Sequence, residues 1–405
     1  MDIPGPGVMD ILFLAHRTPF PPDRGDKIRS FHILRHLAGR ARIHLVAFGE
    51  EAADMTPPPA FSELLASCTI VPRGKSRAVA AMEALASGRP VSLTAFAAPA
   101  LRRAVDAVLA GQAIDANYCF SGQMAQYLPD AGPPVVMDFV DVDSAKFAGY
   151  ASRGLPPLRW LMRREARLLG AFERQVAARV AASLFVSEAE AALFRDGGAR
   201  GRILAVENGI DAGQYDPAHV DPLPGMGPLI VFTGQMDYPP NIEAVRWFAT
   251  AVLPRLVECH PGLRLAIVGR APTAAVTALA SAQVLVTAAV DDVRPWLAAA
   301  TVCIAPLQQA RGIQNKVLEA MAMARPVVAS AAAAEGIDHG GTVRVAADAE
   351  AQVAAIEALL GDPIGAAALG AAARARVLAR YDWAARLAPL DGVLAEIAGG
   401  GGTNA

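Results

Sequence analysis

Short apolar, β-branched runs alternate along the whole chain with longer stretches of helical period that are rich in Ala, Leu and Arg. A strand that is followed by a helix and then by another strand builds a parallel sheet with helices on both faces. The pattern therefore predicts an α/β protein. Its strands are expected at residues 11–14, 43–48, 68–71, 117–120, 135–138, 184–186, 203–206, 229–233, 263–268, 284–286, 302–305, 327–329 and 343–345.

The segment 211–228, DAGQYDPAHVDPLPGMGP, interrupts this alternation. It is rich in Pro, Gly and Asp and poor in periodic apolar residues, which favours a linker. We expect two Rossmann-like, doubly wound domains at 1–212 and 225–383, with a linker at 213–224. Such folds bind ligands at the carboxyl ends of their strands, so we expect the domains to face a central cleft. The last predicted helix, at about 384–398, could pack back on the first domain.

Composition excludes several classes of protein. Hydrophobic residues make up 53% of the chain and charged residues 19%, which predicts a folded protein. A formal net charge of -2 argues against nucleic-acid binding. The four cysteines form no CxxC pair, so neither a zinc site nor a disulfide framework is indicated. We expect no metal site and no cofactor. Neither a signal peptide nor a run of the roughly 20 apolar residues that a membrane span needs is evident, which favours the cytoplasm.

Charged side chains gather after the first predicted strand, in HRTPFPPDRGDKIRS. The prolines and Gly25 predict a stiff loop, and Asp26 can cap the helix that follows. Lys27 lies in the first turn of that helix, where a bound anion would offset the unfavourable interaction of a cation with the helix dipole. We expect this loop, with His16 and Arg24, to line the acceptor side of the cleft. The alternative is a surface loop with solvated charges.

Three aspartates, Asp138, Asp141 and Asp143, follow the strand predicted at 135–138. Carboxylates that crowd at a strand end can act as a base or bind hydroxyl groups. They could instead cap a helix or remain solvated. Asp141 is the preferred candidate for a catalytic base.

Residues 158–182, LRWLMRREARLLGAFERQVAARVAA, form a basic stretch of helical period with six arginines between Arg159 and Arg179. Such a helix could lie on an anionic bilayer, which would make the protein peripheral at the inner membrane. The alternative is an ordinary amphipathic helix with a solvated basic face.

Two loops in the second half place glycine and polar side chains after predicted strands. Gly234 follows the strand at 229–233 and would let the backbone approach a ligand. Asn241 is expected to cap the next helix, at 241–258. Arg270 adds a cation after the strand at 263–268.

The segment 301–330 is the most informative, because a polar loop and the start of a helix lie between two buried strands. Free N–H groups, the helix dipole and two cations would together bind a diphosphate. Glu319 could accept hydrogen bonds from ribose hydroxyls, although Lys316 and Glu319 could also be a surface i, i+3 pair. We predict a donor site formed by Arg311, Gly312, Ile313, Asn315, Lys316 and Glu319.

Taken together, these segments resemble the retaining GT-B glycosyltransferases of family four. The resemblance spans nearly the whole chain and rests on the loop around Gly25, Ser187, NGID at 208–211, GQMDYPPN at 234–241, VGR at 268–270 and NKVLEAMAMARPVVAS at 315–330. More narrowly, PFPPDRGDKIRS with DFVDVDS is similar to the PEP-CTERM/EpsH-associated sugar transferases of bacterial exopolysaccharide clusters.

The resemblance implies a nucleoside-diphosphate sugar as the donor substrate, held mainly by the second domain. Glu319 would bind the ribose, and Lys316 with Arg270 would bind the diphosphate. The first domain would present a saccharide or lipid-linked acceptor. The family uses no bound metal, so these cations would stabilise the leaving diphosphate during transfer with retention. Asp141, Lys316 and Glu319 are thus the catalytic candidates.

One position departs from the family pattern. The first glutamate of the family's paired motif lies eight positions before the second, and here that position is Arg311. We hypothesise that Arg311 grips the carboxylate of an acidic donor sugar, or else adds a diphosphate contact. This departure keeps one other function open, a catalytically silent nucleotide-sugar-binding scaffold. A second alternative is a GT-B epimerase or hydrolase, which would break the same sugar–diphosphate bond without an acceptor. A Rossmann oxidoreductase is disfavoured, because no GxGxxG follows the first strand.

Overall fold

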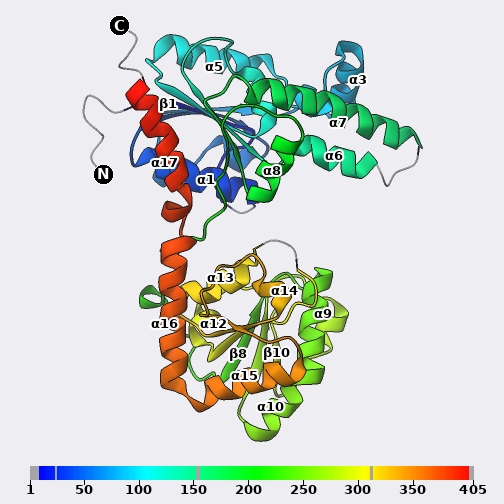
Figure 1. Cartoon of the computed structure of the whole chain (residues 1–405), viewed down its shortest axis with the longest axis vertical. Helices are drawn as coiled ribbons and strands as arrows, with labels where there is room; N and C mark the ends of the chain where they lie inside the picture. The colour runs from blue at the N-terminus through cyan, green and yellow to red at the C-terminus, as the bar shows by residue number, and fades with distance from the viewer. Residues whose placement is uncertain (1–8, 23–24, 152–155, 311–312, 401–405) are drawn as a thin grey trace. The chain divides into compact units, whose positions relative to one another are not determined.

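The computed structural model describes residues 9–22, 25–151, 156–310 and 313–400. The chain divides into two compact units (Figure 1). The first consists of Met1–Asn208 with Arg386–Ala405, and the second is Gly209–Ala385. The boundary between the two units therefore lies between Asn208 and Gly209. This is a few residues before the linker that the sequence analysis placed at 213–224.

The first unit is built on a seven-stranded parallel sheet with the order β3-β2-β1-β4-β5-β6-β7. The inner strands β1 and β4 are buried almost throughout, because helices cover both faces of the sheet (Figure 1). The strands are β1 Asp10–Ala15, β2 Arg42–Gly49, β3 Ser67–Pro72, β4 Ala116–Phe120, β5 Val135–Val140, β6 Ala182–Phe185 and β7 Ile203–Ala205. The helices are α1 Gly25–Ala38, α2 Pro59–Ser62, α3 Arg77–Ser87, α4 Val91–Thr94, α5 Pro99–Gly111, α6 Asp143–Ala151, α7 Pro156–Ala177 and α8 Glu188–Asp196, with 3-10 turns η1 Ala52–Met55 and η2 Gly122–Tyr127.

The second unit is built on a six-stranded parallel sheet with the order β10-β9-β8-β11-β12-β13. Its strands are β8 Leu229–Thr233, β9 Arg264–Val268, β10 Val284–Val286, β11 Val302–Ala305, β12 Val327–Ala329 and β13 Arg344–Val345. Its helices are α9 Pro239–Trp247, α10 Leu253–Cys259, α11 Ala274–Thr277, α12 Arg294–Ala299, α13 Asn315–Ala322, α14 Ala331–Ala334, α15 Ala349–Gly361 and α16 Pro363–Arg380, with a 3-10 turn at Pro217–His219 and a π-helical turn at Phe248–Val252.

The final helix, α17 Trp383–Gly400, contributes its residues from Arg386 onward to the first unit. There His36 Nε2 lies 2.7 Å from Asp391 Oδ1, and Arg202 pairs with Glu396. Among the residues described, no single helix has the length and apolar character to cross a membrane. Helices α15 and α16 meet that test only together, and they are bent by 106°.

Every strand predicted from the sequence is present, and the doubly wound α/β architecture is confirmed. Ser187 is the N-cap of α8 and accepts a hydrogen bond from the backbone N–H of Glu190. The predicted cap at Asn241 is wrong. Helix α9 begins two residues earlier, because two prolines favour its first turn, and Tyr238 is the N-cap.

Two buried carboxylates on α7 bind the starts of neighbouring helices. Glu165 accepts hydrogen bonds from the backbone N–H groups of Val91 (2.7 Å) and Ser92 (2.8 Å), in the first turn of α4. Glu173 accepts from the backbone and the hydroxyl of Ser144, at the start of α6. Burial raises the pKa of Glu173 to about 7, although the hydrogen bonds from Ser144 act to lower it. These carboxylates satisfy N–H groups that a helix start leaves free.

Candidate functional site

Lys316, at the start of α13, contacts the end of β8. Lys316, in the first turn of α13, places Nζ 2.6 Å from Asn241 Oδ1 and 4.1 Å from the centroid of the Phe232 ring. Burial lowers the pKa of Lys316 to about 8, and the charge of Glu319 opposes this shift. No carboxylate forms an ion pair with Lys316 among the described residues. This half-buried ammonium at a helix start is therefore suited to binding an anion.

Two glycines allow the backbone to come close to Lys316. A Cβ at Gly234 would lie 2.7 Å from Asn241 Nδ2 and 3.2 Å from Lys316 Nζ. A Cβ at Gly269 would lie 1.7 Å from the carbonyl oxygen of Gly234. Both positions therefore require glycine, as the approach of strand ends β8 and β9 dictates. Asn241 is held here as well, because its Nδ2 donates to the Gln235 carbonyl at 2.8 Å.

Glu319 lies one helical turn beyond Lys316 and accepts a hydrogen bond from the Tyr215 hydroxyl. Burial raises the pKa of Glu319, while the Tyr215 hydrogen bond and the Lys316 charge lower it. Arg374 Nη1 donates to the carbonyl oxygen of Tyr215 at 2.7 Å and also to that of Ala322. Tyr215 is thus fixed to α13 through both its hydroxyl and its backbone. The sequence analysis missed this tyrosine, whose one signal is its place four residues after NGID.

The remaining predicted donor residues have different surroundings. Arg270 is exposed, and its Nε and Nη2 lie 2.8 and 2.6 Å from the side-chain oxygen of Gln235 in the amide orientation that satisfies both groups. Ile313 packs partly buried against the core of the second unit. Asn315 is the exposed first residue of α13. Arg311 and Gly312 lie outside the described residues.

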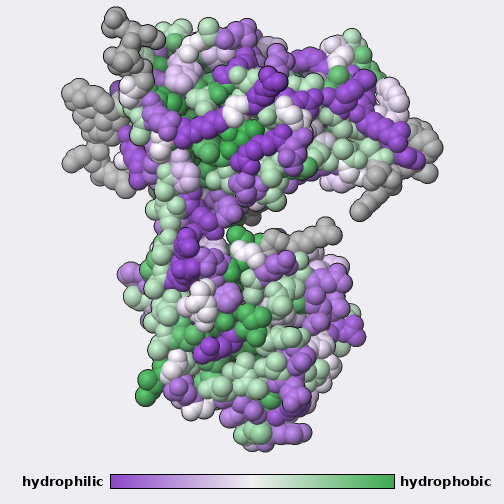
Figure 2. Space-filling model, viewed as in Figure 1, coloured by the Kyte–Doolittle hydropathy of each residue, from purple (hydrophilic) through white to green (hydrophobic). Residues whose placement is uncertain are grey.

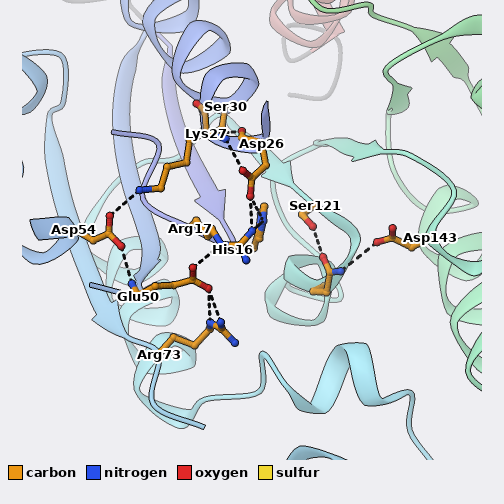
Figure 3. Close-up of polar contacts among 11 residues, drawn as sticks. His16, Arg17, Asp26, Lys27, Ser30, Glu50, Asp54, Arg73, Ser121 and Asp143 are labelled. Carbon is orange, nitrogen blue, oxygen red and sulfur yellow. Dashed lines mark hydrogen bonds and ion pairs between the residues drawn. The ribbon is translucent and has the colours of Figure 1, made fainter. Parts of the chain in front are cut away.

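In the first unit, the carboxyl ends of β1 and β2 carry a chain of ion pairs (Figure 3). Asp26 Oδ2 lies 3.1 Å from His16 Nε2 and also pairs with Arg17. Arg17 Nε lies 2.8 Å from Glu50 Oε2, and Arg73 pairs with the other oxygen of Glu50. Although burial opposes it, hydrogen bonds from His16 and Arg17 hold the pKa of Asp26 well below its usual range.

His16 is buried at the end of β1, stacked 5.7 Å from the Phe120 ring. Burial lowers its pKa, and Asp26 opposes the shift. His16 Nδ1 is buried without a hydrogen-bond partner. A neutral imidazole beside a carboxylate is suited to accepting a proton or orienting a hydroxyl group. Gly25 begins α1, and Arg24 lies outside the described residues.

Two predicted acceptor-side residues are not available to a ligand in this structure. Lys27 is 4% exposed, and its Nζ lies 2.9 Å from Asp54 Oδ1, so it does not serve an anion at the start of α1. Asp138 is fully buried, and its Oδ2 accepts from Arg29 Nε at 3.0 Å and from the Tyr118 hydroxyl at 2.8 Å. Asp54 thus neutralises the buried Lys27, and Asp138 neutralises the buried Arg29. Each cation would be costly to bury without its carboxylate.

Arg29 extends this buried network to the end of the first unit. Its Nη1 donates to the Val206 carbonyl at 2.7 Å and to Asn208 Oδ1 at 2.9 Å. Asp141 and Asp143 lie closer to the surface, with their oxygens 2.7 and 3.2 Å from Lys146 Nζ.

Backbone strain marks the carboxyl ends of two strands next to these groups. Ser121 after β4 has φ 77°, and Val140 at the end of β5 has φ 72°. Such conformations are costly for residues other than glycine and are found most often at functional sites. Ser121 donates to Gln123, whose amide donates to Asp143 (Figure 3). No cluster of three or more metal-binding side chains occurs among the residues described.

Two parallel-sheet α/β units of this kind, with the similar solved structures described below, fit the GT-B fold. Residues 227–362, in the second unit, match the family described as glycosyl transferases group 1. This segment contains Gly234, Asn241, Arg270, Lys316 and Glu319. No curated protein matches the sequence of the chain.

Solved structures resemble the chain over nearly its full length. Anabaena HepE in complex with UDP is 18% identical, with a TM-score of 0.61 over 96% of this chain and 100% of that chain. Sucrose-phosphate synthase from Thermosynechococcus elongatus is 17% identical, with a TM-score of 0.59 over 97% and 100%. A UDP-forming trehalose-phosphate synthase from Burkholderia xenovorans is 12% identical, with a TM-score of 0.56 over 96% and 99%. At these identities the likeness establishes the fold.

Proposed function

We propose that the protein is a glycosyltransferase that moves a sugar from a nucleoside-diphosphate sugar to a saccharide or lipid-linked acceptor. One observation carries this proposal: Lys316 holds a half-buried ammonium without an ion-pair partner among the described residues, beside glycine backbone and one turn before Glu319. The family match over residues 227–362 supports it. So does the similarity to HepE, which was solved with UDP and with UDP-glucose.

In this proposal the second unit binds the donor. Lys316 pairs with the diphosphate, and the free N–H groups at the start of α13 add to its binding. Glu319, oriented by Tyr215, accepts hydrogen bonds from the ribose. As the bond between the sugar and the diphosphate breaks, negative charge grows on the diphosphate. Lys316 and Arg270 stabilise that charge without a metal ion.

The first unit would bind the acceptor in this scheme. The acceptor hydroxyl oxygen bonds to the anomeric carbon and loses its proton to a base. We propose His16, with its carboxylate partner Asp26, as one candidate for that base, and Asp141 as the other. Transfer with retention, and a cytoplasmic role in bacterial exopolysaccharide or cell-surface glycan synthesis, extend the proposal. They rest on the resemblance of PFPPDRGDKIRS and DFVDVDS to sugar transferases of exopolysaccharide clusters.

Calorimetry with UDP, GDP, ADP and CDP tests the donor site. We expect one of them to bind the intact protein, and we expect Lys316→Ala and Glu319→Ala each to weaken it by at least tenfold, the loss of one charge-assisted contact. The matched control is Lys75→Ala, which removes a lysine that pairs with Glu83 in the first unit. Absence of binding to all four nucleotides, or equal affinity of all variants, would refute the proposal.

Donor hydrolysis separates an enzyme from a silent scaffold. A glycosyltransferase releases nucleoside diphosphate slowly when acceptor is absent, whereas a scaffold binds the donor without turnover. His16→Gln and Asp141→Asn are expected to leave nucleotide affinity unchanged, and the one that removes the base is expected to slow transfer. Mass spectrometry of the released nucleotide identifies the carrier. A donor sugar with a carboxylate would favour the hypothesis for Arg311.

A further inference from the structure

A groove of about 570 Å³ in the first unit is lined in part by Val142 and Ser144, the neighbours of Asp143 in the sequence. Helices α6, α7 and α8 line it. Its apolar floor is contributed by small and aliphatic side chains and one ring, among them Val142, Ala145, Ala148, Leu193 and Phe194. Leu193 is 47% exposed, so the floor is open to a ligand.

Three arginines border this groove along one face of α7. Arg163, Arg167 and Arg174 recur at spacings of four and seven residues, which places them in a row. All three are exposed, and none forms an ion pair among the described residues. Figure 2 shows hydrophilic side chains along the exposed side of α7. Trp160, at helical spacing before Arg163, continues the row and is 60% exposed.

The other arginines of α7, and Arg179 in the turn after it, have partners, in contrast to this row. Arg164 Nη2 donates to the Ala84 carbonyl at 2.7 Å, and Arg159 Nε donates to the Ala151 carbonyl at 3.3 Å. Arg179 pairs with Asp130. The carboxylate of Glu173, which precedes Arg174 in the sequence, is bonded to Ser144. The groove thus combines three positive charges with an apolar floor, and no negative side chain lines it.

We propose that this groove binds an anionic membrane lipid. The row Arg163, Arg167 and Arg174 pairs with the phosphate of the headgroup, and the apolar floor takes the adjoining hydrocarbon. A nucleic acid or an acidic peptide would match the charges but would leave the Leu193 side of the floor without an apolar partner. Trp160 has the amphipathic ring that is typical of a membrane–water interface. The inference does not depend on the proposed transferase activity.

Vesicle co-sedimentation of the full chain tests this site. The probes are vesicles of phosphatidylcholine alone and of phosphatidylcholine with phosphatidylglycerol. We expect binding only when phosphatidylglycerol is present. Changing the three row arginines to glutamine is expected to weaken binding roughly a hundredfold, since each arginine near an anionic surface contributes about fivefold. The matched control changes Arg77, Arg103 and Arg200 to glutamine, three exposed arginines of the same unit without ion pairs among the described contacts.

Two further variants test the apolar part of the groove. Leu193→Glu is expected to abolish binding to vesicles while leaving the melting temperature unchanged, because the side chain is half exposed. The fluorescence of Trp160, taken as the difference from Trp160→Phe, is expected to shift to shorter wavelength on phosphatidylglycerol vesicles. If the row variant and the control variant lost the same amount of vesicle binding, net charge alone would explain the binding and the proposal would be overturned. Displacement of the vesicles by an oligonucleotide or by polyglutamate, or normal binding of Leu193→Glu, would overturn it as well.

Discussion

Replacing Lys316 with methionine is expected to stabilise the protein while abolishing nucleotide binding. The pKa of Lys316 falls from the ordinary lysine value of 10.5 to about 8, a difference that corresponds to about 3 kcal/mol for holding the ammonium in the native state. Methionine has a similar length and no charge, so this cost disappears. The change also removes the hydrogen bond to Asn241 and the contact with the Phe232 ring, each about 1 kcal/mol.

The net gain is therefore about 1 kcal/mol, which corresponds to roughly 2–4 °C in melting temperature for a unit of this size. Its pH dependence is the sharper test. Below pH 8 the lysine is protonated in both states, and the native state bears the full cost. Between pH 8 and 10.5 the native state loses the proton first, so the stability of the wild type rises relative to that of Lys316→Met. The advantage of the variant should shrink across this range.

Scanning calorimetry at several pH values measures this difference directly. The control Lys75→Met removes an ion pair with Glu83 and is expected to lower stability by at most about 1 kcal/mol. Nucleoside diphosphate should raise the melting temperature of the wild type and of this control, but not that of Lys316→Met. The reasoning fails if Lys316→Met is less stable than the wild type at pH 7 and the difference stays constant up to pH 10.

Three further changes test other parts of the structure. Tyr215→Phe removes the hydrogen bond to Glu319, so the pKa of Glu319 should rise further and calorimetry should show roughly tenfold weaker nucleotide binding. Arg29→Met leaves Asp138 buried without its cation, and urea denaturation should show a loss of about 3–5 kcal/mol. Gly234→Ala displaces the side chains around Lys316, and we expect a soluble, folded protein that has lost at least tenfold in nucleotide affinity.

The fold could be predicted from the sequence because each buried strand is a short apolar run between helical stretches. Helices on both faces require such runs, so β1, β4 and β8 are as visible in the sequence as in the structure. The exact start of α9 could not be predicted. Both Asn241 and the prolines before it are plausible helix starts, and the chain uses the prolines.

The site was harder to predict, because pairing between distant residues decides which charges are available. Lys27 lies in the same sequence segment as His16, and Asp138 lies in the same segment as Asp141. The local sequence therefore does not distinguish Lys27 and Asp138, which are paired and buried, from their neighbours. Their partners are 27 and 109 residues away along the chain, and no local pattern reveals them. At the start of α13, by contrast, the local sequence alone predicted that Lys316 lies in the first turn of a helix, and the structure has it there.

The buried carboxylates of α7 have a consequence for the arginine row. Glu165 and Glu173 are two turns apart, and each is bonded to the start of a different helix. If α7 slid along its axis by one turn, both carboxylates would lose their donors inside the protein. Glu165 and Glu173 therefore fix the position of α7 along its axis. The row of arginines is not needed for that position. Each of its arginines can therefore be substituted without moving α7.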